Sequence, residues 1–502
     1  MSQRPATRPA SAILSKHFFL SVVAPLHIQP KQFYRLSIQV NTPQQIRQHR
    51  EAHSRRNVSS AAPSIVETGH VTTSVPVSRP LSCLSLSTLI RSYLITSVSS
   101  IPLLLRPSLS VMSFLAHTKS PFFMPDRNPF LHFLLKKTFY AQFCAGETPS
   151  EVRATIADLK HTGYSGVMLG YAKEVVLTKE DAEELDASRD SSDQAALNAE
   201  EIATWKRNTV ATVDLAQAGD FVALKFTGAG RQALQHLKAT IACSHEFEQA
   251  VHEICQSAQQ KGVKLLFDAE QASLQQGIDN WTMYFAKIYN KEQAVVFGTY
   301  QAYAQRTPQV LARHLELARN ENFVLGVKLV RGAYLGSDPR ELFWPTIEET
   351  HKCYNEIAKA VLQRQYQGIL QPVAGCSSEF PQVSLVLATH NAESVRLAGK
   401  LRDEQARNGQ PRIELAYGQL MGMADNVSCE VVQTARSRSE SSEPNVEIPR
   451  AYKYLVWGGL GECMKYLLRR AHENRDAVTR TVEARRALGN ELGSRLAFWR
   501  PQ

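Results

Sequence analysis

The first fifty residues contain no aspartate or glutamate, although seven lysines and arginines are spread along them. An acid-poor, arginine-containing leader is typical of a mitochondrial transit peptide and unlike a secretory signal. Across residues 1–125 the formal charge is +11, and across the remainder of the chain it is −1. The basic character therefore belongs to the N-terminal quarter of the chain, and the nearly neutral body gives no indication of a nucleic-acid-binding surface.

Paired cysteine motifs are also missing. The eight cysteines are irregularly spaced and form no CxxC, which argues against a disulfide scaffold and a zinc site and suits a reducing compartment. Long apolar runs are missing as well, since the longest uncharged run within residues 80–118, Ser92–Leu105, is too short to cross a bilayer. We therefore expect a helical segment there that lies against a membrane surface or the folded body.

What remains is a chain of four parts. Residues 1–60 are interpreted as the transit peptide, 61–79 as a low-complexity linker, 80–147 as an N-terminal helical arm and 148–495 as the folded body. In the body, short apolar runs alternate with amphipathic helical segments, which favours a (β/α)8 barrel of the TIM type over a doubly wound sheet. The expected strands are Tyr164–Tyr171, Phe221–Thr227, Val263–Asp268, Ala294–Gln301, Leu325–Arg331, Val383–Thr389, Arg412–Ala416 and Tyr452–Trp457.

Three segments interrupt this alternation. Residues 182–208 are acidic and rich in Ala and Ser, residues 366–380 contain Pro and Gly, and residues 436–449 are rich in Ser, Glu and Pro. Such compositions are typical of surface insertions. We expect the last of them to lie near the active site.

Polar side chains collect where the expected strands end. Barrel enzymes build their active sites at the carboxyl ends of the strands, so repetition of this pattern predicts one shared pocket. The residues are Lys225, Asp268, Gln301, Arg331, Tyr334, Thr389, His390, Asn391, Gln419 and Tyr454.

A helical stripe near the C-terminus adds an anion-binding pattern. At 100° per residue, Tyr466, Arg469, Arg470 and Glu473 share one face, beside an apolar arc. Two neighbouring guanidiniums can bind a small carboxylate through paired hydrogen bonds. A solvated surface helix with an i,i+4 ion pair is the alternative interpretation.

Other motifs compete with these. Gly228–Ala233 matches G-x-G-x-x-A, but the next acid at a strand end, Asp268, comes 40 residues later instead of about 20. His49 and His53 lack the glutamate of a zinc-protease helix and fall in the leader. Lys225 at a strand end could form a Schiff base, as in a lyase.

Six separated motifs together resemble those of proline dehydrogenases, over about residues 135–495, and in particular the eukaryotic mitochondrial branch. They are Phe267-Asp-Ala-Glu270, Tyr300-Gln-Ala-Tyr303, Lys328-Leu-Val-Arg-Gly-Ala-Tyr-Leu335, Ala388-Thr-His-Asn391, Tyr417-Gly-Gln-Leu-Met-Gly-Met423 and Tyr466-x-x-Arg-Arg-x-x-Glu473. The resemblance implies a distorted (β/α)8 barrel that holds FAD non-covalently. It also implies hydride transfer from C5 of L-proline to N5 of the flavin, which yields Δ1-pyrroline-5-carboxylate in proline catabolism.

The resemblance also assigns roles to residues. Arg469 and Arg470 would bind the substrate carboxylate, with Lys225 and Glu473 orienting them and Asp268 setting the charge balance. Residues expected around the substrate ring are Leu329, Ala333, Tyr334, Tyr454 and Tyr466. Residues expected around the flavin are Gln301, Lys328, Val330, Arg331, Gly332, Thr389, His390, Asn391 and Gln419.

The same resemblance implies electron transfer to ubiquinone and a location on the matrix side of the inner mitochondrial membrane, in contact with the membrane surface. Pyrroline-5-carboxylate dehydrogenase is a candidate partner, and no metal is expected. Three alternatives stay open: a hydroxyproline dehydrogenase, a Lys225 Schiff-base lyase without flavin, and a non-catalytic barrel that binds proline.

Overall fold

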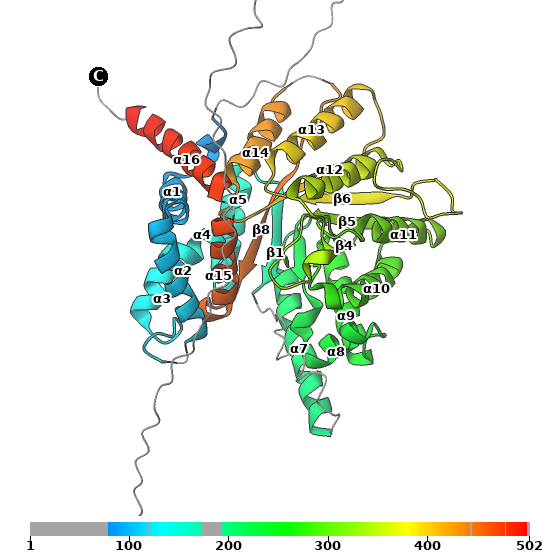
Figure 1. Cartoon of the computed structure of the whole chain (residues 1–502), viewed down its shortest axis with the longest axis horizontal. Coiled ribbons are helices and arrows are strands. Elements are labelled where there is room, and N and C mark those ends of the chain that lie inside the picture. Colours follow the sequence, from blue (N-terminus) through cyan, green and yellow to red (C-terminus); the bar gives the residue numbers. More distant parts are fainter. Residues whose placement is uncertain (1–78, 119, 173–191, 442–443, 477, 499–502) are drawn as a thin grey trace, which may run out of the picture. The chain divides into compact units, whose positions relative to one another are not determined.

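Eight parallel strands close into a barrel in which every strand pairs with its neighbours in the chain and β1 pairs with β8. The computed structural model describes residues 79–118, 120–172, 192–441, 444–476 and 478–498 (Figure 1). The predicted transit peptide and nearly all of the predicted linker lie outside these residues. The strands are β1 (Gly166–Tyr171), β2 (Phe221–Leu224), β3 (Lys264–Phe267), β4 (Val296–Gln301), β5 (Leu325–Val330), β6 (Val383–Ala388), β7 (Glu414–Leu420) and β8 (Ala451–Trp457).

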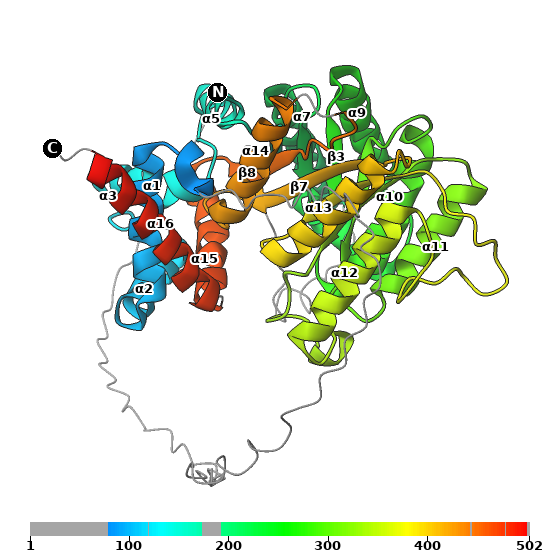
Figure 2. The ribbon, with the colours of Figure 1, turned by 90° about the horizontal axis from the view of Figure 1, so that it is seen from above.

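Helices surround the barrel. Figures 1 and 2 show α1, α2 and α3 beside α15 and α16 on one side, and α10, α11 and α12 on the opposite side. The α-helices are α1 (Leu86–Ser100), α2 (Pro102–His117), α3 (Pro129–Leu135), α4 (Ala141–Phe143), α5 (Pro149–Thr162), α7 (Ser192–Leu215), α8 (Arg231–Ala239), α9 (His245–Lys261), α10 (Ala272–Tyr289), α11 (Thr307–Asn320), α12 (Ile347–Gln363), α13 (Ala392–Arg407), α14 (Asp425–Ser439), α15 (Leu460–Asp476) and α16 (Val478–Phe498). Shorter turns are η1 (Pro80–Cys83), η2 (Lys136–Tyr140), η3 (Phe226–Ala229) and η4 (Arg340–Leu342).

Strand side chains alternate between two cores, because successive residues of a strand point to opposite faces. The barrel interior holds Met168, Phe221, Leu266, Phe297 and Tyr452. The larger core lies between the strands and the surrounding helices. This alternation fixes which residues of each strand end can reach the mouth of the barrel.

Capping residues and glycines in the sequence mark where the helices begin and end. Thr346 and Glu349 form a reciprocal capping box at the start of α12, which satisfies two backbone N–H groups. Gly163, with φ of 109°, ends α5 in the left-handed conformation that glycine adopts without strain.

The predicted strands agree with the observed ones except at their ends. The largest difference is β7, which continues to Leu420 instead of ending at Ala416. The apolar run looked short because Gly418 and Gln419 follow it, yet both belong to the ladder with β6 or β8.

The segment 182–208 was wrongly interpreted as an insertion, at least from residue 192 onward. Residues 192–208 form most of α7, while residues 182–191 lie outside the described part. Its Trp205 is buried and stacks on Phe247 at 5.2 Å. One apolar stripe in an Ala- and acid-rich helix is enough to hold it against the barrel.

The other two segments are mostly connections. Residues 366–380 link α12 to β6. Residues 436–439 end α14, residues 442–443 are outside the described part, and the remainder leads into the amino end of β8. There Glu447 pairs with Arg402 and Arg412. This end is opposite the strand ends that would form an active site, so the expectation of a nearby insertion was wrong.

A buried pair of titratable groups between β4, α10 and α11 predicts an unusual pH response. Burial lowers the pKa of His314 to about 4 and raises the pKa of Asp279 to about 6. As the pH falls from 6.5 to 4, His314 costs stability, because the unfolded chain takes up its proton first. Over nearly the same window Asp279 adds stability, because the folded chain takes up that proton first.

The two contributions nearly cancel in the native chain, and Asp279→Asn removes the favourable one. We expect this variant to lose about 2–3 kcal/mol more unfolding free energy than the native chain between pH 6.5 and pH 4. Urea unfolding at both pH values measures the difference. Asp158→Asn, at an exposed position of α5, is the control. Equal pH dependence in the Asp279 variant and the native chain would refute the assignment.

Candidate active site

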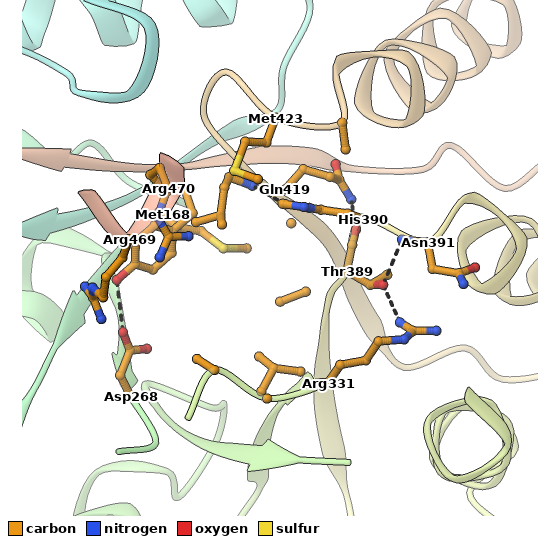
Figure 3. Close-up of a pocket in the computed structure, with 18 of the residues that line it drawn as sticks. Met168, Asp268, Arg331, Thr389, His390, Asn391, Gln419, Met423, Arg469 and Arg470 are labelled. Atoms are coloured by element: carbon orange, nitrogen blue, oxygen red, sulfur yellow. Dashed lines mark hydrogen bonds between the residues drawn. The ribbon is translucent and has the colours of Figure 1, made fainter. Parts of the chain in front are cut away.

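A cavity of about 940 Å³ opens at the carboxyl ends of the strands. This volume is at the upper end of the range for small-molecule sites and can hold a large cofactor together with a small substrate. Its walls come from the barrel mouth, from α15 and from parts of α1, α14 and α16. Figure 3 shows its polar side chains in two groups that face each other across open space.

The first group centres on a buried ion pair. Lys328 Nζ lies 2.5 Å from Asp268 Oδ1, and the Tyr454 hydroxyl donates to Asp268 Oδ2 at 2.9 Å. The same Lys328 ammonium lies 5.1 Å from the centre of the Tyr454 ring. Since Lys328 and Asp268 are only 5% and 9% exposed, each neutralises the other in a site that excludes most water. The phenol is thereby held in one orientation.

Arg469 and Arg470, the arginine pair, complete this side of the cavity. Both line it, Arg470 is buried, and its guanidinium lies 4.9 Å from the centre of the Tyr466 ring. Figure 3 shows the arginine pair on the same side as Asp268. Guanidiniums bind carboxylates through paired N–H···O hydrogen bonds, so this side of the cavity suits a small anionic ligand.

The helix that carries the arginine pair is positioned by the N-terminal arm. Glu147 Oε1 accepts from Leu460 N at 2.9 Å, and Asp126 Oδ1 accepts from Gly461 N at 2.8 Å. The Tyr140 hydroxyl donates to Gly458 O at 2.7 Å. Carboxylates at the N-terminus of α15 satisfy its first N–H groups and interact favourably with its dipole. The arm is therefore part of the site's support.

The second group forms the polar wall, comprising Arg331, Thr389, His390, Asn391 and Gln419. Arg331 donates to Thr389 Oγ1 at 2.5 Å, and Thr389 Oγ1 also accepts from Asn391 N at 3.1 Å. Asn391 caps α13. A guanidinium beside a helix N-terminus is a favourable place for phosphate groups.

Three further contacts of Arg331 keep its side chain in place. It donates to His351 Nδ1 at 3.0 Å and to Ser394 Oγ at 2.9 Å, and it lies 4.3 Å from the centre of the Tyr354 ring. A planar guanidinium can make these contacts together, and a lysine ammonium cannot.

Gln419 and His390 supply directional hydrogen-bonding groups. Gln419 Nε2 donates to Thr389 O at 3.1 Å, and Leu420 N donates to His390 Nε2 at 3.1 Å. When neutral, His390 therefore carries its proton on Nδ1. Gln419 Oε1 is buried and has no hydrogen-bond partner among the described residues. An acceptor left in this state beside a polar cavity suits a ligand that brings an N–H group.

Gly332 brings the backbone close to the cavity. Its φ is +146°, and a Cβ built there would lie 2.5 Å from the Tyr303 ring. That ring stacks on Phe343 at 4.1 Å, and its hydroxyl accepts from Tyr334 N. Only glycine fits this turn without displacing the ring.

Most of the predicted site residues meet at this cavity. Those lining it are Lys225, Asp268, Gln301, Lys328, Val330, Arg331, Gly332, Ala333, Tyr334, Thr389, His390, Asn391, Gln419, Tyr454, Tyr466, Arg469 and Arg470. The backbone of Glu473 lies in α15, but its side chain lies outside the described part.

Leu329 is placed differently from the expectation. It is fully buried in the core between the strands and the helices. Its neighbours Lys328 and Val330 line the cavity, so strand alternation turns Leu329 away from it. Contact with the substrate ring is therefore the wrong role for this residue.

Other lining residues were missed by the sequence analysis. Met168, Thr299 and Trp205 line the cavity, and Trp205 Nε1 donates to the carbonyl of Lys225 at 3.0 Å. The inward parity of β1 and β4 could have revealed Met168 and Thr299. Trp205 had a weaker signal, the apolar stripe of α7.

The glycine-rich match at Gly228 does not form a phosphate site. Glu201 accepts from Arg231 N at 2.9 Å, so a carboxylate already occupies the N-terminus of α8. A phosphate there would meet like charge.

The fold and the cavity together define a TIM-barrel protein with a ligand site at the barrel mouth. The sequence profile described as Proline dehydrogenase matches residues 152–483, and the chain belongs to this family, in its eukaryotic branch. Among curated relatives, a probable mitochondrial proline dehydrogenase of Schizosaccharomyces pombe is 29% identical over 80% of this chain and 87% of its own length.

More distant similarities agree with this assignment. The mitochondrial proline dehydrogenase 1 of Dictyostelium discoideum is 28% identical over 69% of this chain and 63% of its own length. A hydroxyproline dehydrogenase of Bos taurus is 27% identical over 72% of this chain and 82% of its own length. The crystal structure of proline utilization A from Bdellovibrio bacteriovorus shares the fold, with a TM-score of 0.57 and 16% identity over 79% of this chain and 40% of that one.

Proposed function

We propose that this protein oxidises L-proline to Δ1-pyrroline-5-carboxylate with non-covalently bound FAD. The observation that carries the proposal is the placement of the arginine pair opposite the polar wall, across one cavity at the barrel mouth (Figure 3). One side suits a small carboxylate, and the other suits a large cofactor with phosphates. Family membership and mitochondrial relatives support both the reaction and a mitochondrial location.

The residues present fit a flavin dinucleotide. Arg331 and the N-terminus of α13 would hold the phosphates, while Gln301, His390 and Gln419 would bond polar edges of the cofactor. The buried Gln419 Oε1 is the acceptor that such a ligand would satisfy. When bound, FAD supplies the hydride acceptor that the protein's own side chains lack.

On the substrate side, the protein orients proline and excludes water. The arginine pair would bind the carboxylate of proline in a bidentate manner, and the Tyr454 and Tyr466 rings would pack against its ring. Asp268 and Lys328 neutralise each other, so this pair adds no net charge beside the substrate. Binding of the zwitterion or anion then depends on the arginine pair rather than on a general excess of charge.

Flavin reduction is the test. The purified full-length protein, reconstituted with FAD, should lose its flavin absorbance when L-proline is added without oxygen. A protein that takes up no FAD would overturn the proposal, and so would bound FAD that L-proline does not reduce. Reduction by hydroxyproline alone would select the hydroxyproline alternative, for which the bovine relative is the supporting similarity. Borohydride trapping of substrate on Lys225 would select the lyase.

We further propose ubiquinone as electron acceptor, pyrroline-5-carboxylate dehydrogenase as the enzyme that consumes the product, and the matrix side of the inner membrane as location. The acceptor, the partner and the matrix side follow from the resemblance to proline dehydrogenases. The support for membrane contact is the surface of α1, α2 and α3, here called the arm surface. Its exposed apolar side chains include Leu94, Leu103, Phe114, Phe130 and Phe133. Between residues 79 and 137 the chain has seven Lys/Arg and one acid. Apolar side chains among basic ones suit the surface of an anionic bilayer.

The arm surface suits lateral binding. Among the described residues, no single helix is long and apolar enough to span a bilayer. The helices Leu86–Ser100 and Leu103–His117, with a bend of 101° between them, would be long and apolar enough only as a pair, by length and composition. We favour helices that lie in the interface, because α1 and α2 each bury one face against the protein.

Vesicle binding tests whether the arm surface contacts the membrane. The double variant Leu103→Ser, Phe130→Ser should bind cardiolipin-containing vesicles about tenfold more weakly than the native chain, since it loses two exposed apolar anchors. Leu197→Ser removes another exposed leucine, from α7, and should have no effect. If the α7 control loses binding as much as the double variant, or neither does, the arm surface is not the contact.

A further inference from the structure

Two thiols join the start of the N-terminal arm to the barrel. Cys83 ends η1 and is half-buried, while Cys429 is fully buried in the second turn of α14. Cys83 packs against one apolar cluster that contains Cys429, Leu81, Leu89 and Leu488. Both are reduced in this structure.

The backbone around Cys83 is held in place on two sides. Gln433, one turn after Cys429, donates to Ser82 Oγ at 3.0 Å. From α16, Arg495 donates to the carbonyls of Ser82 and Leu84 at 3.0 and 2.9 Å. The two thiols therefore meet in a fixed arrangement and do not depend on a chance encounter of a mobile segment.

The two thiols also differ in acidity. The hydrogen bond from Cys429 lowers the pKa of Cys83, so the accessible thiol is the one that ionises more readily. The same contact, together with burial, raises the pKa of Cys429 and keeps that thiol protonated. An accessible thiolate beside a second, resolving cysteine is the arrangement found at redox-sensitive sites.

A second thiol pair provides a comparison within the molecule. Cys144 and Cys463 also belong to one apolar cluster, but both are fully buried, and burial raises the pKa of Cys144. Neither thiol is accessible to an oxidant, so this pair should remain reduced.

We propose that Cys83 and Cys429 form a reversible disulfide that fastens the start of the arm to α14 when a hydroperoxide is present. The Cys83 thiolate attacks the peroxide oxygen, forming a sulfenic acid, and the other oxygen leaves with a proton as water or an alcohol. The Cys429 sulfur then displaces the sulfenic hydroxyl, which leaves as water with the Cys429 proton. The two thiols lose two electrons in total, and the peroxide gains them.

The expected consequence is a more stable attachment of the arm. The disulfide would close a loop of several hundred residues, which restricts the unfolded chain strongly. It would also fix one wall of the cavity, since Leu81 from η1 and Ala424–Val427 at the start of α14 line it.

The test uses the full-length holoenzyme treated with a small excess of hydrogen peroxide. Non-reducing peptide mapping should find Cys83 linked to Cys429, and the Tm should rise by about 5 °C and return with dithiothreitol. Cys83→Ser should abolish the shift, Cys463→Ser should retain it, and Cys429→Ser should accumulate a dimedone-reactive sulfenic acid at Cys83. A Cys144–Cys463 link, a stable sulfenic acid in the native chain, or a Tm shift that persists in Cys83→Ser would overturn the proposal.

Discussion

Replacing Arg470 by methionine is expected to lower kcat/KM for L-proline at least about 100-fold, mostly through KM. Hydrogen bonds to a charged ligand contribute about 1.5–3 kcal/mol each, and about 1.4 kcal/mol corresponds to a factor of ten. Methionine keeps the length of the buried side chain and can still pack on Tyr466, so the loss isolates the guanidinium. Steady-state kinetics with L-proline measures it, and FAD content should stay at the native level.

The matched control lies on the same helix. Lys465→Met removes one positive charge from an exposed position of α15 and should leave kcat/KM within about twofold of native. Arg469→Met should behave like the Arg470 variant. Native KM values in both arginine variants would show that the carboxylate binds elsewhere.

Replacing Gly332 by alanine should have the second large effect, on both stability and FAD binding. The new Cβ would enter the Tyr303 ring at a backbone conformation that alanine rarely adopts. We expect a loss of about 3 kcal/mol in unfolding free energy and a weaker flavin complex, since the neighbouring Arg331 and Ala333 also line the cavity. Urea unfolding of the apoprotein and a flavin titration measure the two separately.

Gly336 offers the control four residues further along the same loop. Nothing lies within 4 Å of a Cβ built there, and the position is exposed. Gly336→Ala should therefore be neutral in the unfolding measurement. If the two variants behave alike, the close approach at Gly332 has no energetic importance.

The barrel and most of the cavity could be predicted because their signals are local. Each strand is a short apolar run, and its last residues carry polar groups such as Asp268 and Thr389. Parallel strands in a barrel bring all such ends to one mouth, so these separate local observations combine into one site.

The failures have different physical causes. Leu329 belongs to a motif whose neighbours line the cavity, yet strand alternation turns it outward. Trp205 lies in a helix whose composition resembles an insertion, and one apolar stripe decides its place. The contacts of Glu147 and Asp126 with α15 join residues more than 300 positions apart, and no local pattern reports such pairs.

Those last contacts bear on how the protein reaches its active state. The polar wall is built from elements that follow one another in the chain, from β5 to β7, so its parts are separated by short stretches of chain. The arginine pair lies in α15, near the end of the chain. Carboxylates from a much earlier part of the chain, Glu147 and Asp126, hold this helix, so the pair is positioned only after these distant segments meet. Contacts of such long separation form late, since loop closure is costly before they are made. We therefore expect the polar wall to become ordered before the arginine pair during folding.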